Sequence, residues 1–288
     1  MREILKIVAL SVLLPVLLPV GLSAAEQGDK VTAIVEGHIV PGFARFQDRA
    51  NDLVASAESE CPANPQAIQS AYHLTADAWL GVSHLRFGPT EADDRAFAIA
   101  FWPDTKGFTP KVLSKLLQDA DPVVLDPQDF ATLSIAGRGL YALEFLLFDD
   151  RLSQAGTPDY RCDLIRAIAT DVQGNATAIL QDWKPDYARA MTDPGQGHGR
   201  YETRDETVQE LLKALDAGLQ FTSDTRLGRP LGSFDRPRPK RAENWRSGRS
   251  LHNVVLSLGA LRDLAGLLAA DDPALAQDLD RAFTLALD

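Results

Sequence analysis

Hydrophobic residues recur at intervals of three and four along almost the whole chain, which is the period of an amphipathic α-helix. The pattern predicts helices over residues 30–58, 65–87, 93–101, 110–118, 130–149, 161–183, 207–221, 241–270 and 273–287, with loops at 122–127, 192–201 and 222–239. No run alternates with a period of two between hairpin turns, so we expect no sheet. We therefore predict an all-α protein, a helical bundle in which two bundle-like halves, residues 26–155 and 156–288, pack together.

The first of these helices carries a proline and a histidine close together. Pro41 cannot donate a hydrogen bond to the carbonyl of Gly37, so the helix should bend there. His38 lies on the apolar face beside that carbonyl. A lone histidine on such a face is usually a satisfied core residue. His73 and His84 are expected to be ordinary surface or core histidines, and His198 is expected in a solvated loop.

One acidic residue stands on a stripe that should face the core. Glu144 shares the helical spacing of Leu140, Leu143 and Leu147, with Tyr141 one turn before it. An ionised carboxylate in an apolar setting needs a cation, a metal ion or strong hydrogen-bond donors close by, because otherwise its pKa rises and it becomes neutral. The sequence thus predicts a crowded polar site inside a helical core.

The residues around Glu144 also match a known motif. Gly139, Tyr141 and Glu144 occupy the marked positions of Gly-x-His-x-x-Glu, with tyrosine in place of histidine. The chain resembles the imelysin family of bacterial envelope proteins in this motif and in the segments 38–43, 86–89, 101–104 and 241–251, which follow family order. The resemblance implies a two-part helical fold with the site at the junction of the parts. The family is sometimes classed as metallopeptidases, and the tyrosine weakens any metal or peptidase role carried over from it.

The N-terminal segment has the pattern of a secretory signal peptide. Arg2 and Lys6 precede an apolar run at residues 7–20, and small residues at 23–25 suit cleavage. The run is short and contains two prolines, which disfavours a membrane anchor. We predict removal of residues 1–25, a periplasmic mature protein and no stable membrane insertion of the mature chain.

The net charge and the cysteines make some binding partners and some kinds of site less favoured than others. The net charge of −11 disfavours nucleic acid, and the basic stretch at 229–249 is too rich in proline to form a binding helix. Cys61 and Cys162 are the only cysteines, and in an oxidising compartment we favour a disulfide between them over two free thiols. Neither has a second cysteine or a histidine at the spacing of a metal site.

Glu144, His38 and Tyr141 together could form a metal site, with Glu144 and His38 as the ligands. Carboxylate and phenolate are hard donors that suit iron(III), although the phenol needs a metal ion or a cation to lose its proton at neutral pH. The leading hypothesis is a periplasmic imelysin-like binding protein linked to the uptake or handling of iron or another metal ion, with Glu144 as its polar anchor.

Two alternatives to a metal-binding protein remain, and the first of them involves the predicted C-terminal helix. Arg246, Arg249 and Ser250 form a polar stripe, which is either a solvated face or a site for a carboxylate, that of Glu144 or of a ligand. If one of these arginines neutralises Glu144, the junction would take a non-metal ligand or an envelope protein. A metallopeptidase is less favoured because no compact set of three zinc ligands is present. Asp104 would either support the site or cap a turn.

Overall fold

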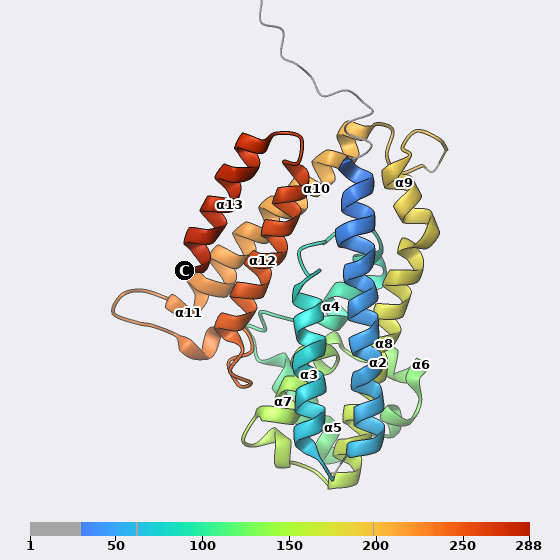
Figure 1. Cartoon of the computed structure of the whole chain (residues 1–288). Helices are drawn as coiled ribbons and strands as arrows, with labels where there is room; N and C mark the ends of the chain where they lie inside the picture. Colours follow the sequence, from blue (N-terminus) through green and yellow to red (C-terminus); the bar gives the residue numbers. More distant parts are fainter. Residues whose placement is uncertain (1–29, 62, 198) are drawn as a thin grey trace, which may run out of the picture.

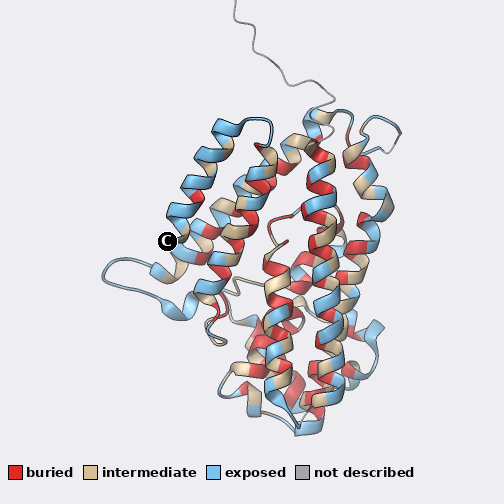
Figure 2. Ribbon diagram, in the orientation of Figure 1, coloured by how far each residue is buried: buried red, intermediate tan, exposed pale blue. Residues whose placement is uncertain are grey.

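Four helices surround the main core of this computed structural model, which describes residues 30–61, 63–197 and 199–288. They are α2 (Val40–Glu60), α3 (Pro65–Leu80), α7 (Gly139–Phe148) and α8 (Pro158–Asp182), and α2 packs along both α3 and α8 (Figure 1). The residues on their inner faces are buried, as the red ribbon segments in Figure 2 show. Among the described residues the regular elements are all helical, which confirms the all-α fold. The predicted signal peptide and His198 lie outside these residues.

A second group of helices lies beside the first. It consists of α10 (Arg204–Gln220), α12 (Ser250–Leu268) and α13 (Pro273–Leu287), and α12 packs against both others and against α3 (Figure 1). Among the described residues, α12 has a length and composition that would also suit a membrane span. Its apolar residues instead contact α13 through Leu261, Ala265 and Phe283. The division at residue 155 stays a prediction, and α8 from the second part packs directly on α2 and α7.

Short helices connect these long ones. They are η2 (Gly88–Thr90), η3 (Ala92–Asp94), α4 (Arg95–Ile99), α5 (Phe108–Asp119), η4 (Pro122–Leu125), α6 (Pro127–Ala131), η5 (Ile135–Gly137), η6 (Leu152–Gln154), η7 (Trp183–Tyr187) and α9 (Ala188–Thr192). The bend expected at Pro41 takes the form of a π-helical turn, η1 (Val35–Ile39), directly before α2. Such turns let a helix absorb a residue that cannot complete the regular hydrogen-bond ladder.

The helix predicted over 130–149 is broken in the structure. Arg138 is extended and Gly139 has a φ of 75°, so α7 begins only at Gly139. A Cβ at Gly139 would lie 2.2 Å from the carbonyl oxygen of Ala98, so only glycine lets these backbones meet. Arg138 then forms a two-pronged ion pair with Asp171 of α8, at 2.6 and 3.0 Å. The break therefore fixes the start of α7 against α8.

Two more predicted boundaries were wrong. The loop expected at 222–239 begins as helix, because α10 continues through a π-helical segment, η8 (Phe221–Gly228), into α11 (Arg229–Leu231). The helix expected at 241–270 begins only at Ser250, after a short 3₁₀ turn, η9 (Pro239–Arg241). Asn244 and Gly248 have positive φ values of 48° and 70°, which no continuous helix tolerates. Arg246 and Arg249 consequently lie on a folded loop ahead of α12.

The expected disulfide is present. Cys61 caps the C-terminal end of α2, and Cys162 lies in the first turns of α8, with Cα atoms 5.8 Å apart. The bond joins positions separated by 101 residues, so it removes much of the freedom of the unfolded chain. It ties together the same two helices that form the centre of the core.

We expect Gly139→Ala to lower the free energy of unfolding by at least about 2 kcal/mol, because alanine meets both an unfavourable φ and a backbone carbonyl. Gly174→Ala is the matched control. Gly174 is exposed within α8, and a Cβ there would meet nothing within 4 Å, so alanine should raise stability by roughly 0.5–1 kcal/mol. Urea unfolding of both variants gives the measurement, and equal effects would contradict the account of the break.

Candidate functional site

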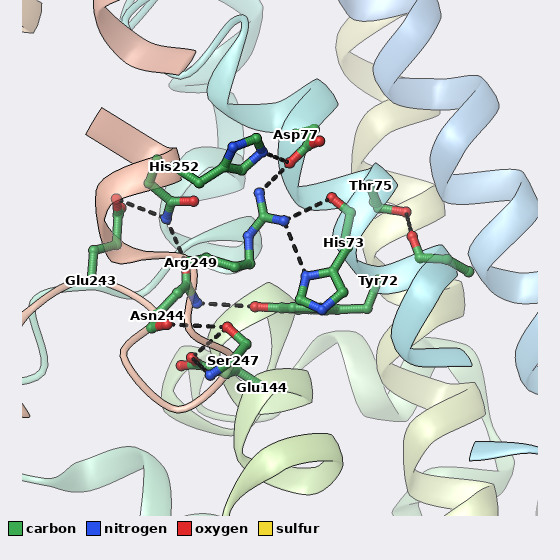
Figure 3. Close-up of polar contacts among 12 residues, drawn as sticks. Tyr72, His73, Thr75, Asp77, Glu144, Glu243, Asn244, Ser247, Arg249 and His252 are labelled. Atoms are coloured by element: carbon green, nitrogen blue, oxygen red, sulfur yellow. Dashed lines mark hydrogen bonds and ion pairs between the residues drawn. The ribbon is translucent and has the colours of Figure 1, made fainter. Parts of the chain in front are cut away.

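Glu144 lies buried on α7, as its position on the apolar stripe predicted. Its side chain is 2% exposed. The backbone N–H and the hydroxyl of Ser247 both donate to Glu144 Oε1, at 3.0 and 2.9 Å (Figure 3). The polar environment that a buried acid needs therefore comes from a loop about one hundred residues away in sequence.

The pKa of Glu144 is raised above its ordinary value. Burial is the main cause, and it outweighs the opposing effects of the two Ser247 hydrogen bonds and the more distant charge of Arg246. Neutral donors can satisfy a carboxylate but compensate its charge less completely than a directly bound cation does. Glu144 is thus an acid whose protonated form the fold favours.

Tyr141 turns its hydroxyl toward a second buried acid. The hydroxyl donates to Glu243 Oε1, and its ring stacks on Trp102 with an interplanar angle of 11° and centroids 6.2 Å apart. Burial and the neighbouring carboxylate of Glu243 raise the pKa of Tyr141 well above its ordinary value. The residue is therefore a neutral phenol bound to Glu243, and it is not the phenolate that an iron(III) ligand would require.

Glu243 is the centre of a buried network. Arg226 Nε lies 2.8 Å from Glu243 Oε2, and Asn253 Nδ2 donates to the same oxygen at 3.0 Å. The side chains of Arg226 and Glu243 are 7% and 3% exposed, so this ion pair is shielded from solvent. We call Tyr141, Arg226, Glu243 and Asn253 the Glu243 network.

Asn244 fixes the loop that reaches Glu144. Its left-handed backbone, which asparagine adopts more readily than most residues, turns the chain sharply. Its side-chain amide donates to the hydroxyl of Tyr72 on α3 at 3.0 Å and accepts from Asn253 at 2.8 Å. The loop is therefore held by α3 and α12 while Ser247 faces α7 (Figure 3).

The structure does not bring His38 to Glu144. His38 Nε2 lies 3.1 Å from Nε2 of His84, and both rings are buried. Burial lowers the pKa of His38, and it lowers the pKa of His84 to about 3. The pair is consequently neutral, with one ring donating to the other. His84 is buried, which is one of the two placements expected for it, and His38 contacts His84 and not Glu144.

The arginines of the predicted polar stripe bind other acids. Arg246 donates to Asp149 at 2.8 Å and stacks on Phe145, with 3.7 Å from its guanidinium carbon to the ring centre. Arg249 pairs with Asp77 of α3 and also contacts the backbone oxygen of His73. Neither contacts Glu144, so the structure does not support the alternative in which one of them neutralises it directly.

Ser250 opens α12, and among the described residues its side chain makes no hydrogen bond to Glu144 or to the Glu243 network. Ser247, three positions earlier, takes the place at Glu144 that the polar stripe suggested for Ser250. The difference arises because the chain around Ser247 is a folded loop and not the helix that the stripe assumes.

A cleft of about 470 Å³ opens beside Glu144 and Tyr141. Five aromatic residues line it, Phe101, Trp102, Tyr141, Phe145 and Trp245, and its basic side chains are Arg229, Lys240, Arg241 and Arg246. Asp104 and Glu144 are its only acidic lining residues among those described. The cleft volume lies within the range of roughly 300–1,000 Å³ that is typical of small-molecule sites.

Several polar atoms at this cleft lack a protein partner. Thr109 Oγ1 is one, on a side chain that is 1% exposed, and Arg229 Nε and Asp104 Oδ1 are the others. The second oxygen of Asp104 accepts from the backbone N–H of Thr109 at 2.8 Å, which supports the capping role. Buried polar atoms normally find a partner, so a bound ligand or solvent would complete them.

The residues present do not form a site for a bare metal ion. Within the described part of the chain, no three His, Cys, Asp or Glu side chains gather closely enough to hold one. Near Glu144, the phenol of Tyr141 is hydrogen-bonded to Glu243, and Ser247 donates to the carboxylate of Glu144. The donor set therefore does not match the expected iron or metal site.

Sequence reasoning missed the main partners in this site. Glu243, Asn244 and Ser247 lie inside the family-like segment 241–251, which could have directed attention to them. Nothing in the sequence pattern indicated a role for Arg226 in this site, because it lies in a stretch predicted to be a loop. Tyr72 lies in the helix predicted over residues 65–87, and nothing in the pattern indicated its contact with Asn244.

The fold and the site define an all-helical protein with a polar cleft at its core. The family model for imelysin matches residues 39–288, so the chain belongs to the imelysin family. "Iron-regulated protein A" of Synechococcus elongatus is 23% identical over 280 residues, covering 89% of this chain and 73% of that protein.

Two solved structures share the fold. An imelysin-like protein from Psychrobacter arcticum superposes with a TM-score of 0.77 at 15% identity, covering 94% of this chain and 86% of the other. A protein from Parabacteroides distasonis, provisionally described as an iron-regulated protein A precursor, gives a TM-score of 0.71 at 12% identity, covering 86% and 76%. At these identities the likeness establishes the fold alone.

Substitutions at Glu144 should separate its charge from its hydrogen bonds. Because the pKa of Glu144 is higher in the folded chain, ionisation destabilises the fold as pH rises from the unfolded value of 4.5 toward the raised folded value. We expect Glu144→Gln to remove this pH dependence, so that its stability relative to wild type grows across that interval. Glu144→Ala should be about 1–3 kcal/mol less stable than Glu144→Gln, because it leaves the Ser247 donors unpaired. Urea unfolding at several pH values tests both, and a wild-type advantage that grows with pH would refute the burial argument.

Removing the charge of Glu243 should lower the free energy of unfolding more than removing the charge of Glu144 does. Glu243→Gln leaves Arg226 as a buried cation without a counter-charge, and we expect a loss of roughly 3–5 kcal/mol in the free energy of unfolding. Asp52→Asn is the control, because it breaks the exposed Arg49–Asp52 pair and should cost less than about 1 kcal/mol. Similar losses in the two variants would mean that the Glu243 network does not stabilise the core.

Proposed function

We propose that this chain is a binding protein of the cell envelope, linked to iron, that takes an anionic iron(III) chelate in the cleft beside Glu144. The observation that carries the proposal is the combination of unpartnered polar atoms and basic side chains around one cleft of ligand size. Catalysis plays no part in it.

The iron link rests on relatives. A curated relative is named for its regulation by iron, and a structural neighbour carries a similar provisional description. That neighbour is also described as a precursor, which agrees with the signal peptide predicted at residues 1–25. Both observations favour a secreted protein that works on iron outside the cytoplasm.

The form of the iron follows from the side chains. A bare ion would need several free carboxylate, phenolate or imidazole donors, and here Glu144, Tyr141 and His38 are either separated or bound to other partners. An ion already enclosed by an organic acid needs no direct protein ligands. It needs positive charge and hydrogen-bond donors for the outward-facing oxygens of the acid.

The cleft provides such groups. Arg229 has an unpartnered Nε, and Lys240 and Arg241 lie on the same wall, without an ion pair to an acid among the described residues. Thr109 adds a buried hydroxyl. Trp102 and Trp245 present apolar surface that can cover the carbon framework of a ligand.

Isothermal titration of the chain from residue 26 onward with ferric citrate tests the proposal. We expect saturable binding that Arg229→Ala weakens by roughly tenfold to a hundredfold, the usual effect of losing a charge-assisted hydrogen bond. Thr109→Val, which keeps the shape but removes the hydroxyl, should weaken binding by a smaller factor. Arg281→Ala, on the exposed face of α13, is the matched control and should leave binding unchanged.

Two further titrations separate the alternatives. Iron-free citrate that binds as tightly as the ferric complex would refute the iron link and favour a non-metal ligand in the same cleft. Saturable binding of free ferric, ferrous or zinc ions that Glu144→Gln abolishes would refute the chelate and restore the bare-ion site.

A further inference from the structure

The segment between α11 and α12 forms an ordered projection. Ser233 and Arg236 form an antiparallel bridge, and the backbone N–H of Arg238 donates to the carbonyl of Pro230 at 2.7 Å. Gly232 has a φ of 63°, and a Cβ there would lie 2.4 Å from the oxygen of Arg236, so the turn requires glycine. We call residues 229–241 the basic hairpin.

The tip of the basic hairpin is apolar and fully exposed. Phe234 is 103% exposed and Leu231 is 66% exposed, whereas five of the twelve phenylalanines of this chain are buried in the core. Figure 2 shows the projection beside α11 as exposed along its length, and it stands away from the helices. A large apolar residue at the end of a projecting turn marks a surface for interaction.

The basic hairpin is positively charged, whereas the chain as a whole is negatively charged. It holds five arginine or lysine residues and one aspartate, a net of +4 in a chain whose net charge is −11, so the other residues carry −15. Within the described residues, none of these five cations forms an ion pair with an acid. Arg236 and Arg238, which do not line the cleft, are therefore free to meet negative charge from outside.

We propose that the basic hairpin docks the protein on an anionic lipid bilayer, with Phe234 and Leu231 entering the headgroup region and Arg236 and Arg238 binding lipid phosphates. Apolar insertion combined with electrostatic attraction is the general basis of peripheral membrane binding. Arg229, Lys240 and Arg241 at the base of the hairpin line the cleft, so docking would also place the cleft near the membrane surface.

A bilayer fits this surface better than an acidic protein does. A stable protein interface typically buries about 800 Å² on each partner with matched shapes, and a narrow turn bearing one phenyl ring offers little of that. A bilayer admits a single inserted ring and demands no matching shape. The acidic remainder of the chain opposes approach only weakly, because charges beyond the Debye length of about 8 Å are largely screened at physiological salt.

Vesicle co-sedimentation of the chain from residue 26 onward tests the proposal without any iron ligand. We expect binding to vesicles that contain phosphatidylglycerol, little binding to phosphatidylcholine alone, and loss of binding as salt rises. Phe234→Ala should weaken binding by roughly tenfold, and Arg236→Ala with Arg238→Ala by roughly tenfold or more. None of these residues lines the cleft, so the variants should still bind ferric citrate if the proposed function holds.

Matched controls change residues of the same kind elsewhere. Leu285→Ala removes an apolar side chain that is 80% exposed on α13, and Arg49→Ala with Lys213→Ala removes two cations from other helices. Both should bind vesicles as the wild type does. Equal losses in the control and hairpin variants would overturn the proposal, since binding would then be a property of the whole surface.

A spectroscopic measurement locates the contact. Ser233→Cys places a label next to Phe234, and the two native cysteines are already joined to each other. An environment-sensitive dye there should shift its emission to the blue on anionic vesicles, whereas a dye at Leu285→Cys should not. An unshifted hairpin label, or binding to acidic proteins without any binding to vesicles, would overturn the proposal.

Discussion

The structure depends on satisfying two carboxylates inside a helical core. Glu144 and Glu243 come from segments far apart in sequence, and each is almost completely buried. Removing a carboxylate from water without partners would cost several kcal/mol, so the fold must supply donors to each. Arg226 provides the charge for Glu243, and Ser247 provides two neutral donors for Glu144. The folded loop before α12 takes part in both sites, because it carries Glu243 itself and supplies the Ser247 donors to Glu144.

This arrangement decides what chemistry is left for a ligand. Tyr141, where the family motif has histidine, is bound to Glu243 and is held in its neutral form. The side chains that a metal ion would use are thus occupied in holding the fold together. Arg229 and Thr109, each with a polar atom that lacks a protein partner, lie on the cleft wall instead. Positive charge and hydrogen-bond donors, and not metal ligands, are therefore what this site presents.

The sequence predicted the parts of the structure that depend on local pattern. Helical periodicity identified the long helices and the burial of Glu144, and the two cysteines, taken with the predicted signal peptide, indicated the disulfide. It failed at Gly139 and at residues 241–249, where left-handed residues interrupt a helix that the spacing predicted to be continuous. It also failed to pair Glu144 with Ser247, because residues 103 positions apart meet only through the packing of α7 against the loop. The spacing of residue types along the chain does not show which distant segments will contact each other in the fold.

The consecutive helical elements η8 and α11 link the core, the cleft and the basic hairpin. Arg226 in η8 turns inward to Glu243, Arg229 at the start of α11 lines the cleft, and the hairpin follows directly. Because the inward ion pair is buried, it holds η8 in a fixed position against the core. The orientation of the cleft wall and of the projecting turn then follows from the same contact. A change at the Glu243 network would therefore reach both surfaces, whereas a change at the hairpin tip would leave the core intact.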